Sequence, residues 1–369
     1  MIKIQKYSEV EEEFFKGRSF GESNEVVNSV LEEVAKKGDS ALRIYGTKFD
    51  VASPKTYEIP QDELKAAAEK LRIKNPDVYN AIRYSHELAL RFAKEQRKSF
   101  KDFEIELEPG VFTGQKTIPV ERAGCYVPAG RFPLVSSVVM AVTPAKAAGV
   151  KEIIMCTPPR VHPDDKAEAD KTGKGVKGKA YTGGKPYADE GIMAAAYICE
   201  VDHVYAVGGA QAIGAMAYGT ESIPQVDVIV GPGNKFVAAA KKEVYGTVGI
   251  DMIAGPTEVL IIADSTAKPK WVAADLLAQA EHDVVAQPVL VTPDEKLAEK
   301  VSAEIEKQLE TLPTKATARQ SIDTCGKIII VDSLEQAMEV ANRKAPEHLE
   351  LAMEDGEERD NLVKMARNY

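Results

Sequence analysis

The feature that most constrains the fold is a regular alternation of two kinds of segment after about residue 103. Short runs rich in Val and Ile end in Gly or Pro turns, and Ala-rich stretches with helical spacing follow them. Continuous apolar strands that alternate with helices are typical of a parallel sheet covered on both faces. The sequence therefore predicts an α/β fold with strands in residues 116–127, 150–159, 201–209, 225–233, 257–264, 287–294 and 326–333.

The segment before this alternation is predicted to be helical. Apolar side chains recur every three or four positions in residues 26–50, 61–73 and 75–100. Asn75, followed by a proline, suits the start of the third helix, because Asn caps a first turn and Pro is tolerated at the first helical position. Residues 158–186 interrupt the later pattern with many Gly, Lys and Asp residues, so we expect a partly mobile surface loop there.

Composition narrows the class of protein. The 47 basic and 57 acidic residues give a formal charge of −10, whereas a protein that holds nucleic acid needs a basic face. No window approaches the roughly 18 unbroken apolar residues of a membrane helix. Near the start of the sequence, a run of glutamates stands where a signal peptide would have its apolar segment. We therefore expect a cytoplasmic protein with no nucleic-acid or membrane partner. The four scattered cysteines are expected to be buried and unpaired.

Three glycine turns follow predicted strands, and ligands of parallel sheets bind at the carboxyl ends of the strands. They are Gly124–Gly130, which contains Tyr126, then Gly208–Gln211, then Gly231–Asn234. A glycine turn before a helix N-terminus suits a phosphate or pyrophosphate, and Tyr126 is expected to pack on a flat ring. Each turn alone is equally explained by a need for positive φ, and none is a G-x-G-x-x-G fingerprint. Together they favour a cofactor site.

Three further segments carry polar side chains suited to chemistry. Thr257 offers a hydroxyl after a Gly-Pro turn. Gln279 and His282 point the same way on a helix and could share a metal ion, although a hydrogen-bonded helix end is the simpler alternative. Glu347 and His348 are adjacent, and an imidazole can take a proton from an alcohol while a carboxylate beside it activates water.

These motifs, in this order, resemble the histidinol dehydrogenase family from about Val27 to the last residue, most densely between Val204 and Gln287. The resemblance implies an enzyme that oxidises an alcohol to a carboxylate in two NAD-dependent hydride transfers and binds zinc. L-Histidinol, oxidised to L-histidine in histidine biosynthesis, is the expected substrate.

The resemblance also implies an architecture and a set of site residues. It implies a homodimer and two incomplete Rossmann-like units: residues 25–125 with 259–369 on the substrate and zinc side, and an inserted NAD-binding unit of residues 126–258. Residues 1–24 are expected to form an N-terminal helical arm. The family's functional positions match the following residues: NAD contacts Tyr126, Gln211 and Asn234; substrate contacts Thr257, Gln279, His282 and His348; zinc ligands Gln279 and His282; and the acid–base pair Glu347 and His348.

Two departures from the family leave alternatives open. The sequence ends before the family's C-terminal tail, which carries two more zinc ligands, so we expect weak zinc binding and low activity, or a dimerising relative that is not an enzyme. Arg131 and Phe132, together with Thr257, resemble the sulfopropanediol 3-dehydrogenase branch, whose substrate is dihydroxypropanesulfonate. Ala345-Pro346 before the Glu-His pair instead favours histidinol.

Overall fold

The computed structural model of the chain describes residues 1–16, 24–129, 133–253 and 257–367. These residues form two compact units, which are described separately: unit 1 comprises Met1–Ser19 and Gly255–Tyr369, and unit 2 comprises Phe20–Ala254. The division differs from the predicted one, because residues 25–125 belong with 126–254 and not with the C-terminal segment. The function expected of each domain stays a prediction.

Unit 1 is built on a sheet of five parallel strands in the order β1-β14-β13-β12-β15. The strands are β1 (Lys3–Lys6), β12 (Glu258–Ala263), β13 (Gln287–Thr292), β14 (Lys327–Ile330) and β15 (His348–Ala352). Three of them confirm predicted strands, whereas β1 and β15 were not predicted. The expected N-terminal helical arm is wrong for residues 3–6, which pair as a strand with residues 327–330.

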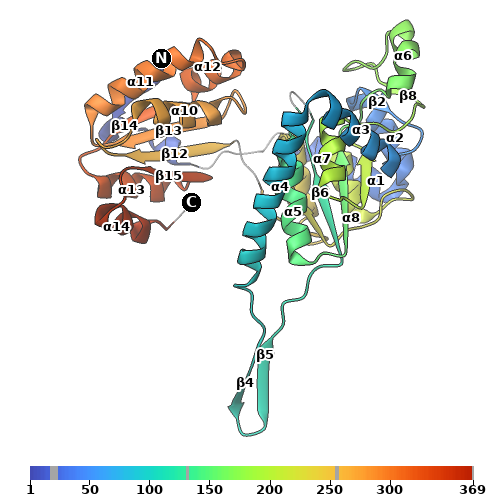
Figure 1. The fold of residues 1–369 in the computed structure, drawn as a ribbon, viewed down its shortest axis with the longest axis horizontal. Coiled ribbons are helices and arrows are strands. Elements are labelled where there is room, and N and C mark those ends of the chain that lie inside the picture. Colours follow the sequence, from blue (N-terminus) through green and yellow to red (C-terminus); the bar gives the residue numbers. More distant parts are fainter. Residues whose placement is uncertain (17–23, 130–132, 254–256, 368–369) are drawn as a thin grey trace. The chain divides into compact units, whose positions relative to one another are not determined.

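Helices cover both faces of the unit 1 sheet (Figure 1). Val259 and Ile261 face the side covered by α10 (Pro269–Ala280), α11 (Glu295–Leu309) and α12 (Lys315–Thr324). Leu260 and Ile262 face the side covered by α13 (Leu334–Lys344) and α14 (Glu357–Met365). Successive strand side chains point to opposite faces, so a strand buried on both faces needs the unbroken apolar run found here.

Unit 2 contains a second sheet in the order β11-β10-β6-β7-β9-β3. Its strands are parallel except β3, which runs antiparallel to β9. Their bounds are β3 (Glu58–Ile59), β6 (Arg122–Tyr126), β7 (Glu152–Thr157), β9 (His203–Ala206), β10 (Val228–Val230) and β11 (Gly249–Ile250). The doubly wound α/β fold predicted from the alternation is confirmed.

Two layers of helices enclose this second sheet, each with its own apolar core. One layer consists of α1 (Asn24–Lys37), α2 (Asp39–Phe49), α8 (Gly209–Tyr218) and α9 (Lys235–Val244). The other consists of α3 (Gln61–Lys74), α4 (Pro76–Arg97), α5 (Val135–Ala148) and α7 (Glu190–Ile198). The predicted start of α4 is confirmed, because the Asn75 side chain accepts the backbone N–H of Val78 at 3.4 Å.

Two segments of unit 2 lie outside these layers. Residues 158–186 fold into a 3₁₀ turn (Pro163–Asp165), α6 (Lys166–Thr172) and β8 (Tyr181–Thr182), which pairs with β2 (Ala52–Ser53). The segment predicted as a partly mobile surface loop therefore contains a helix and a paired strand, and its mobility stays a prediction. A hairpin of β4 (Phe103–Glu108) and β5 (Val111–Gln115) follows α4 and extends away from the sheet (Figure 1).

Two predictions from composition concern the whole chain. The four cysteines are free, and Cys125, Cys156 and Cys199 are buried, as expected. In the part of the chain that the structure describes, no helix combines the length and apolarity that a membrane crossing requires.

Candidate functional site

The three glycine turns of unit 2 lie at one edge of its sheet. Tyr126 ends β6, the turn at Gly208 follows β9, and Gly231 follows β10. Strands β10, β6, β7 and β9 are consecutive and parallel, so their carboxyl ends meet at the same edge. This confirms that the turns lie where a doubly wound sheet binds its ligands.

The turn at Gly231 is held rigidly from within the protein. Gly231 has φ of 116°, and a side chain there would collide with the carbonyl oxygen of Tyr126. Its N–H donates to Asp251 Oδ2 at 2.8 Å, and its carbonyl accepts from Lys241 Nζ at 3.0 Å. Lys241 is 2% exposed and forms an ion pair with Asp251. Both polar backbone groups of Gly231 are therefore fixed by one ion pair.

The predicted NAD-contacting residue Asn234 caps the helix that follows this turn. Its Oδ1 accepts the backbone N–H groups of Phe236 and Val237 at 3.0 and 3.2 Å, which starts α9. The Asn234 side chain is exposed. A capped helix start beside a glycine turn presents positive partial charge, which suits the pyrophosphate of a dinucleotide.

The turn at Gly208 brings together two predicted cofactor residues and one that sequence reasoning missed. The hydroxyl of Tyr126 accepts the N–H of Gly209 at 3.0 Å, and Gln211 Nε2 donates to Asp50 Oδ2 at 3.2 Å. Tyr126 and Gln211 are each 2% exposed. In this structure the Tyr126 ring lies in the core and joins two turns, and its expected contact with a flat ligand stays a prediction.

Asp50 directly follows α2, in the segment that was predicted only to be helical. Burial raises its pKa to about 7, although the hydrogen bond from Gln211 acts in the opposite direction. No spacing or motif marked this residue, because the contact joins positions 161 residues apart.

The predicted residues of unit 1 lie at the amino ends of the strands, not at the carboxyl ends. Thr257 precedes β12, and Glu347 and His348 stand at the start of β15, which pairs with β12. The carbonyl of Thr257 accepts the N–H of Gln287, the first residue of β13, at 3.0 Å. Our expectation that function lies at the carboxyl ends is therefore wrong for this unit.

The Glu347–His348 pair is positioned by an unusual turn at the end of α13. Ala345 has φ of 51°, a left-handed conformation that costs a non-glycine residue energy. Glu347 Oε2 accepts the backbone N–H of Glu258 at 3.3 Å, and Glu347 Oε1 lies 3.9 Å from His348 Nε2. The His348 side chain is 56% exposed. A tethered carboxylate thus stands beside an accessible imidazole.

A buried ion pair lies at the same place, where the end of α13 meets the start of β12. Lys344 Nζ donates to Glu258 Oε1 at 2.8 Å, and the two side chains are 5% and 16% exposed. Breaking one member of such a pair is costly, because it leaves an uncompensated charge. The pair therefore holds the end of α13 against the start of β12, where Glu347 is attached.

The candidate metal ligands lie at the end of α10. The N–H of His282 donates to the carbonyl of Gln279 at 3.3 Å, and the His282 side chain is exposed. Gln279 Nε2 is buried and has no hydrogen-bond partner among the described residues. No group of three or more His, Cys, Asp or Glu side chains suited to a metal occurs among the described residues. The two predicted zinc ligands, Gln279 and His282, therefore lie close together in sequence at the end of one helix, and their role stays a prediction.

Two carboxylates near this corner were also missed. Glu350 lies two residues after His348 on β15, and Asp275 lies one turn before Gln279 on α10. Burial, followed by repulsion from Asp275, raises the pKa of Glu350, and His348 acts in the opposite direction. Burial also raises the pKa of Asp275. The repulsion between Asp275 and Glu350 is the observed interaction between α10 and the strand that carries His348.

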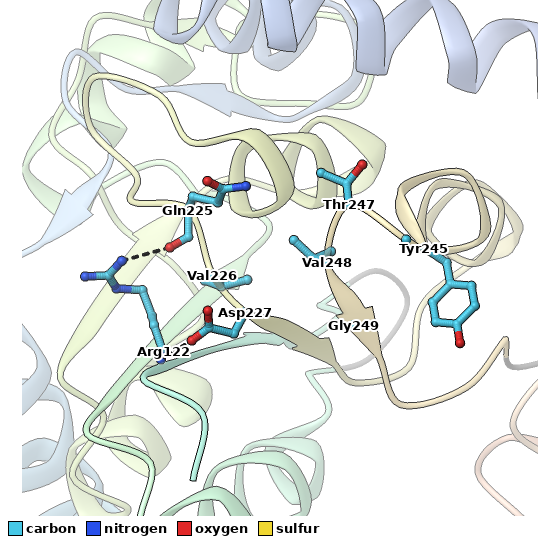
Figure 2. Close-up of a pocket in the computed structure, with 9 residues that line it drawn as sticks. Arg122, Gln225, Val226, Asp227, Tyr245, Thr247, Val248 and Gly249 are labelled. Atoms are coloured by element: carbon cyan, nitrogen blue, oxygen red, sulfur yellow. Dashed lines mark hydrogen bonds between the residues drawn. The ribbon is translucent and has the colours of Figure 1, made fainter. Parts of the chain in front are cut away.

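A cavity of about 740 Å³ lies at the opposite, amino edge of the unit 2 sheet (Figure 2). Its charged groups are engaged with neighbouring protein atoms. Arg122 donates to the carbonyl of Gln225 at 2.8 Å and to Glu152 at 2.6 Å, and Asp227 accepts the N–H of Arg122 at 2.8 Å. Arg122 and Asp227, the charged groups of this cavity, are therefore already paired within the protein.

Several positions of interest lie outside the described residues. They are Gly130, Arg131 and Phe132, which carry the resemblance to the sulfonate branch, and residues 254–256 of the turn before Thr257.

The chain is an NAD-dependent dehydrogenase that acts on a CH–OH group, and its similarity to known proteins shows this. The sequence profile of histidinol dehydrogenase matches residues 16–176 and 180–368. The chain therefore belongs to the histidinol dehydrogenase family.

Individual relatives support this membership. The histidinol dehydrogenase of Streptococcus mutans is 46% identical over 328 residues, which cover 89% of this chain and 70% of that protein. That of Aquifex aeolicus is 44% identical over 333 residues, again 89% and 70% of the two chains. The crystal structure of the Elizabethkingia anophelis histidinol dehydrogenase is similar with a TM-score of 0.83 at 33% identity, covering 100% of this chain and 78% of that chain.

Proposed function

We propose that this chain oxidises L-histidinol to L-histidine with two molecules of NAD, in two hydride transfers. The observation that carries the proposal is the Glu347–His348 pair, which is tethered to the start of β12 beside Thr257 and leaves the imidazole accessible. Relatives named histidinol dehydrogenase, at 42–46% identity over about nine tenths of the chain, support the choice of substrate.

The first step oxidises the alcohol. His348 accepts the hydroxyl proton while the hydride on the same carbon leaves for the nicotinamide, so the products are the aldehyde, NADH and one proton held on the imidazole. An imidazole suits this role because its ordinary pKa lies near neutral pH.

The second step needs a water molecule. Glu347 removes a proton from water as the water oxygen adds to the aldehyde carbon, and the protonated His348 donates its proton to the aldehyde oxygen, which gives the hydrated aldehyde. The neutral His348 then accepts a hydroxyl proton as a second hydride leaves for a second NAD, which gives the carboxylic acid. The acid ionises to the carboxylate, and the released protons pass to solvent. Tethering of Glu347 to the Glu258 N–H keeps the base in place for this step.

The other predicted residues are assigned to binding. Tyr126, Gln211 and Asn234 would hold NAD at the glycine turns. An added β-carbon at Gly231 would collide with the backbone of Tyr126, and one at Gly209 would come within 2.8 Å of the Gln211 side chain. The Thr257 hydroxyl would contact the substrate. Gln279 and His282 would contribute to holding zinc, which when bound anchors and polarises the substrate.

One observation favours a second substrate, dihydroxypropanesulfonate. A threonine at position 257 is similar to the sulfopropanediol branch, in which that compound is oxidised with NAD. Parallel assays of NADH formation from L-histidinol and from dihydroxypropanesulfonate separate the two candidates. Turnover of the sulfonate alone would overturn the histidinol proposal.

We also propose that the chain forms a homodimer. The β4–β5 hairpin exposes apolar side chains along its length, and such surface is typical of an interface. The exposed members are Phe103, Ile105, Leu107, Val111 and Phe112. We place the enzyme in the cytoplasm, where thiols such as its four free cysteines stay reduced.

The test of the two roles uses histidinol and histidinal as separate substrates. We expect His348→Asn to slow both oxidations about 10²- to 10⁴-fold, and Glu347→Gln to slow the oxidation of histidinal far more than that of histidinol. His203→Asn, which removes a partly exposed histidine of unit 2, is the control and should leave both rates unchanged. Equal losses with both substrates for Glu347→Gln would contradict the assignment.

A further inference from the structure

We infer that Asp50 is a positioning residue for the cofactor: its carboxylate fixes the orientation of the Gln211 amide. The inference rests on the proposed function, because it takes Gln211 as a contact of NAD. It adds a residue from the helical N-terminal region, which carries no motif.

The contact is specific. Gln211 Nε2 donates to Asp50 Oδ2 at 3.2 Å, and Gln211 is 2% exposed. An ionised carboxylate only accepts hydrogen bonds, so it selects the amide orientation in which the NH₂ group faces Asp50. The carbonyl oxygen of Gln211 then lies beside Gly209, at 2.8 Å from the place of a β-carbon there. This oxygen is the group offered at the turn as an acceptor.

The turn is shaped around these two side chains. A β-carbon on Gly208 would lie 3.1 Å from Asp50 Oδ1 and 3.1 Å from the backbone of Pro158. The two consecutive glycines thus let a carboxylate and an amide approach the start of α8 from either side. This arrangement is what a device for orienting the amide needs, and a merely structural hydrogen bond does not require it.

When Asp50 is protonated, it no longer selects one orientation of the Gln211 amide. A neutral carboxyl group can donate to the Gln211 oxygen as well as accept from its nitrogen, so both amide orientations become available. Burial raises the pKa of Asp50 to about 7. The titratable group that interacts with it from β6 is Tyr126, whose phenol stays neutral in this range because burial raises its pKa further. The ordering of the amide therefore changes near neutral pH.

The test is the dissociation constant of NAD, measured by calorimetry on the whole chain from about pH 6 to 8. If binding needs the ionised carboxylate, affinity of the wild type rises about tenfold over this range. Asp50→Asn should bind NAD about tenfold more weakly at pH 8 and without pH dependence, because an asparagine accepts either orientation. Asp50→Glu should restore the pH dependence. Asp227→Asn, at the other edge of the same sheet, removes a charge without this contact and should behave as wild type.

The outcomes separate the two claims. Wild type that binds NAD with the same affinity at all these pH values overturns the role of Asp50, even if Asp50→Asn does not fold. An Asp50→Asn variant that keeps the wild-type pH dependence overturns it as well. Wild type that does not bind NAD at any pH overturns the proposed function itself, and this inference with it.

Discussion

Replacing Lys241 by Met should destabilise unit 2 and loosen the turn at Gly231. The substitution removes the ion pair with Asp251 and the hydrogen bond to the Gly231 carbonyl. Breaking a buried pair costs about 3–5 kcal/mol, because one charge is left uncompensated. Here Asp251 is one third exposed and keeps the N–H donors of Gly231 and Met252, so we expect a smaller loss of about 2–3 kcal/mol. Met fills a similar volume and adds little cavity cost.

Thermal unfolding followed by circular dichroism measures this loss. For a unit of this size, about 2–3 kcal/mol corresponds to a fall of roughly 5–10 °C in Tm. Lys242→Met is the matched control, because this neighbouring lysine is exposed, and it should change stability by less than about 0.5 kcal/mol. The double variant with Asp251→Asn should lose less than the sum of the single losses, because no charge is left unpaired. Equal Tm values for the Lys241 and Lys242 variants would refute the reasoning.

Three further predictions concern unit 1. Ala345→Gly should stabilise the protein by up to about 1 kcal/mol in urea unfolding, because Ala345 has positive φ, whereas Ala341→Gly within α13 should destabilise it by about 1 kcal/mol. Glu350→Gln should raise stability at neutral pH and leave it unchanged below about pH 4. Burial raises the folded-state pKa of Glu350, so the wild type loses stability as the pH rises past the unfolded-state pKa. A uniform effect of the substitution at all pH values would contradict this. Gln279→Leu should raise the stability of the metal-free protein, because it replaces an amide whose nitrogen is buried and unpaired among the described residues. The same substitution should lower the amount of zinc retained per chain in equilibrium dialysis. Unchanged zinc retention would show that Gln279 is not a zinc ligand.

The layered fold was predictable because its signal is local. Each central strand is a short apolar run, and β12 shows why: Val259 and Leu260 enter different cores on opposite faces of the sheet. The strands that were missed lack this signal. β1 holds one apolar residue, the exposed Ile4, and its buried residue is the polar Gln5. It lies at the sheet edge, and its pairing with β14 joins segments more than 300 residues apart. β15 begins at His348, in a segment whose polar residues suggested chemistry and not a strand.

The residues of the candidate site could be picked out from the sequence, but the contacts that hold them in place could not. Glycine turns and the adjacent Glu-His pair are visible in the sequence because their members are neighbours along the chain. Asp50 and Lys344 act through contacts with Gln211 and Glu258, which are distant in sequence, so no spacing could indicate them. The amino-end position of the unit 1 residues was missed because the carboxyl-end rule was applied to both sheets.

The central claim is that this chain carries an alcohol through to a carboxylic acid. The most direct test is the yield of NADH per molecule of L-histidinol, with the substrate limiting and zinc and NAD in excess. The account predicts two NADH and one L-histidine for each L-histidinol consumed. One NADH with accumulation of the aldehyde, or no NADH at all, would contradict it.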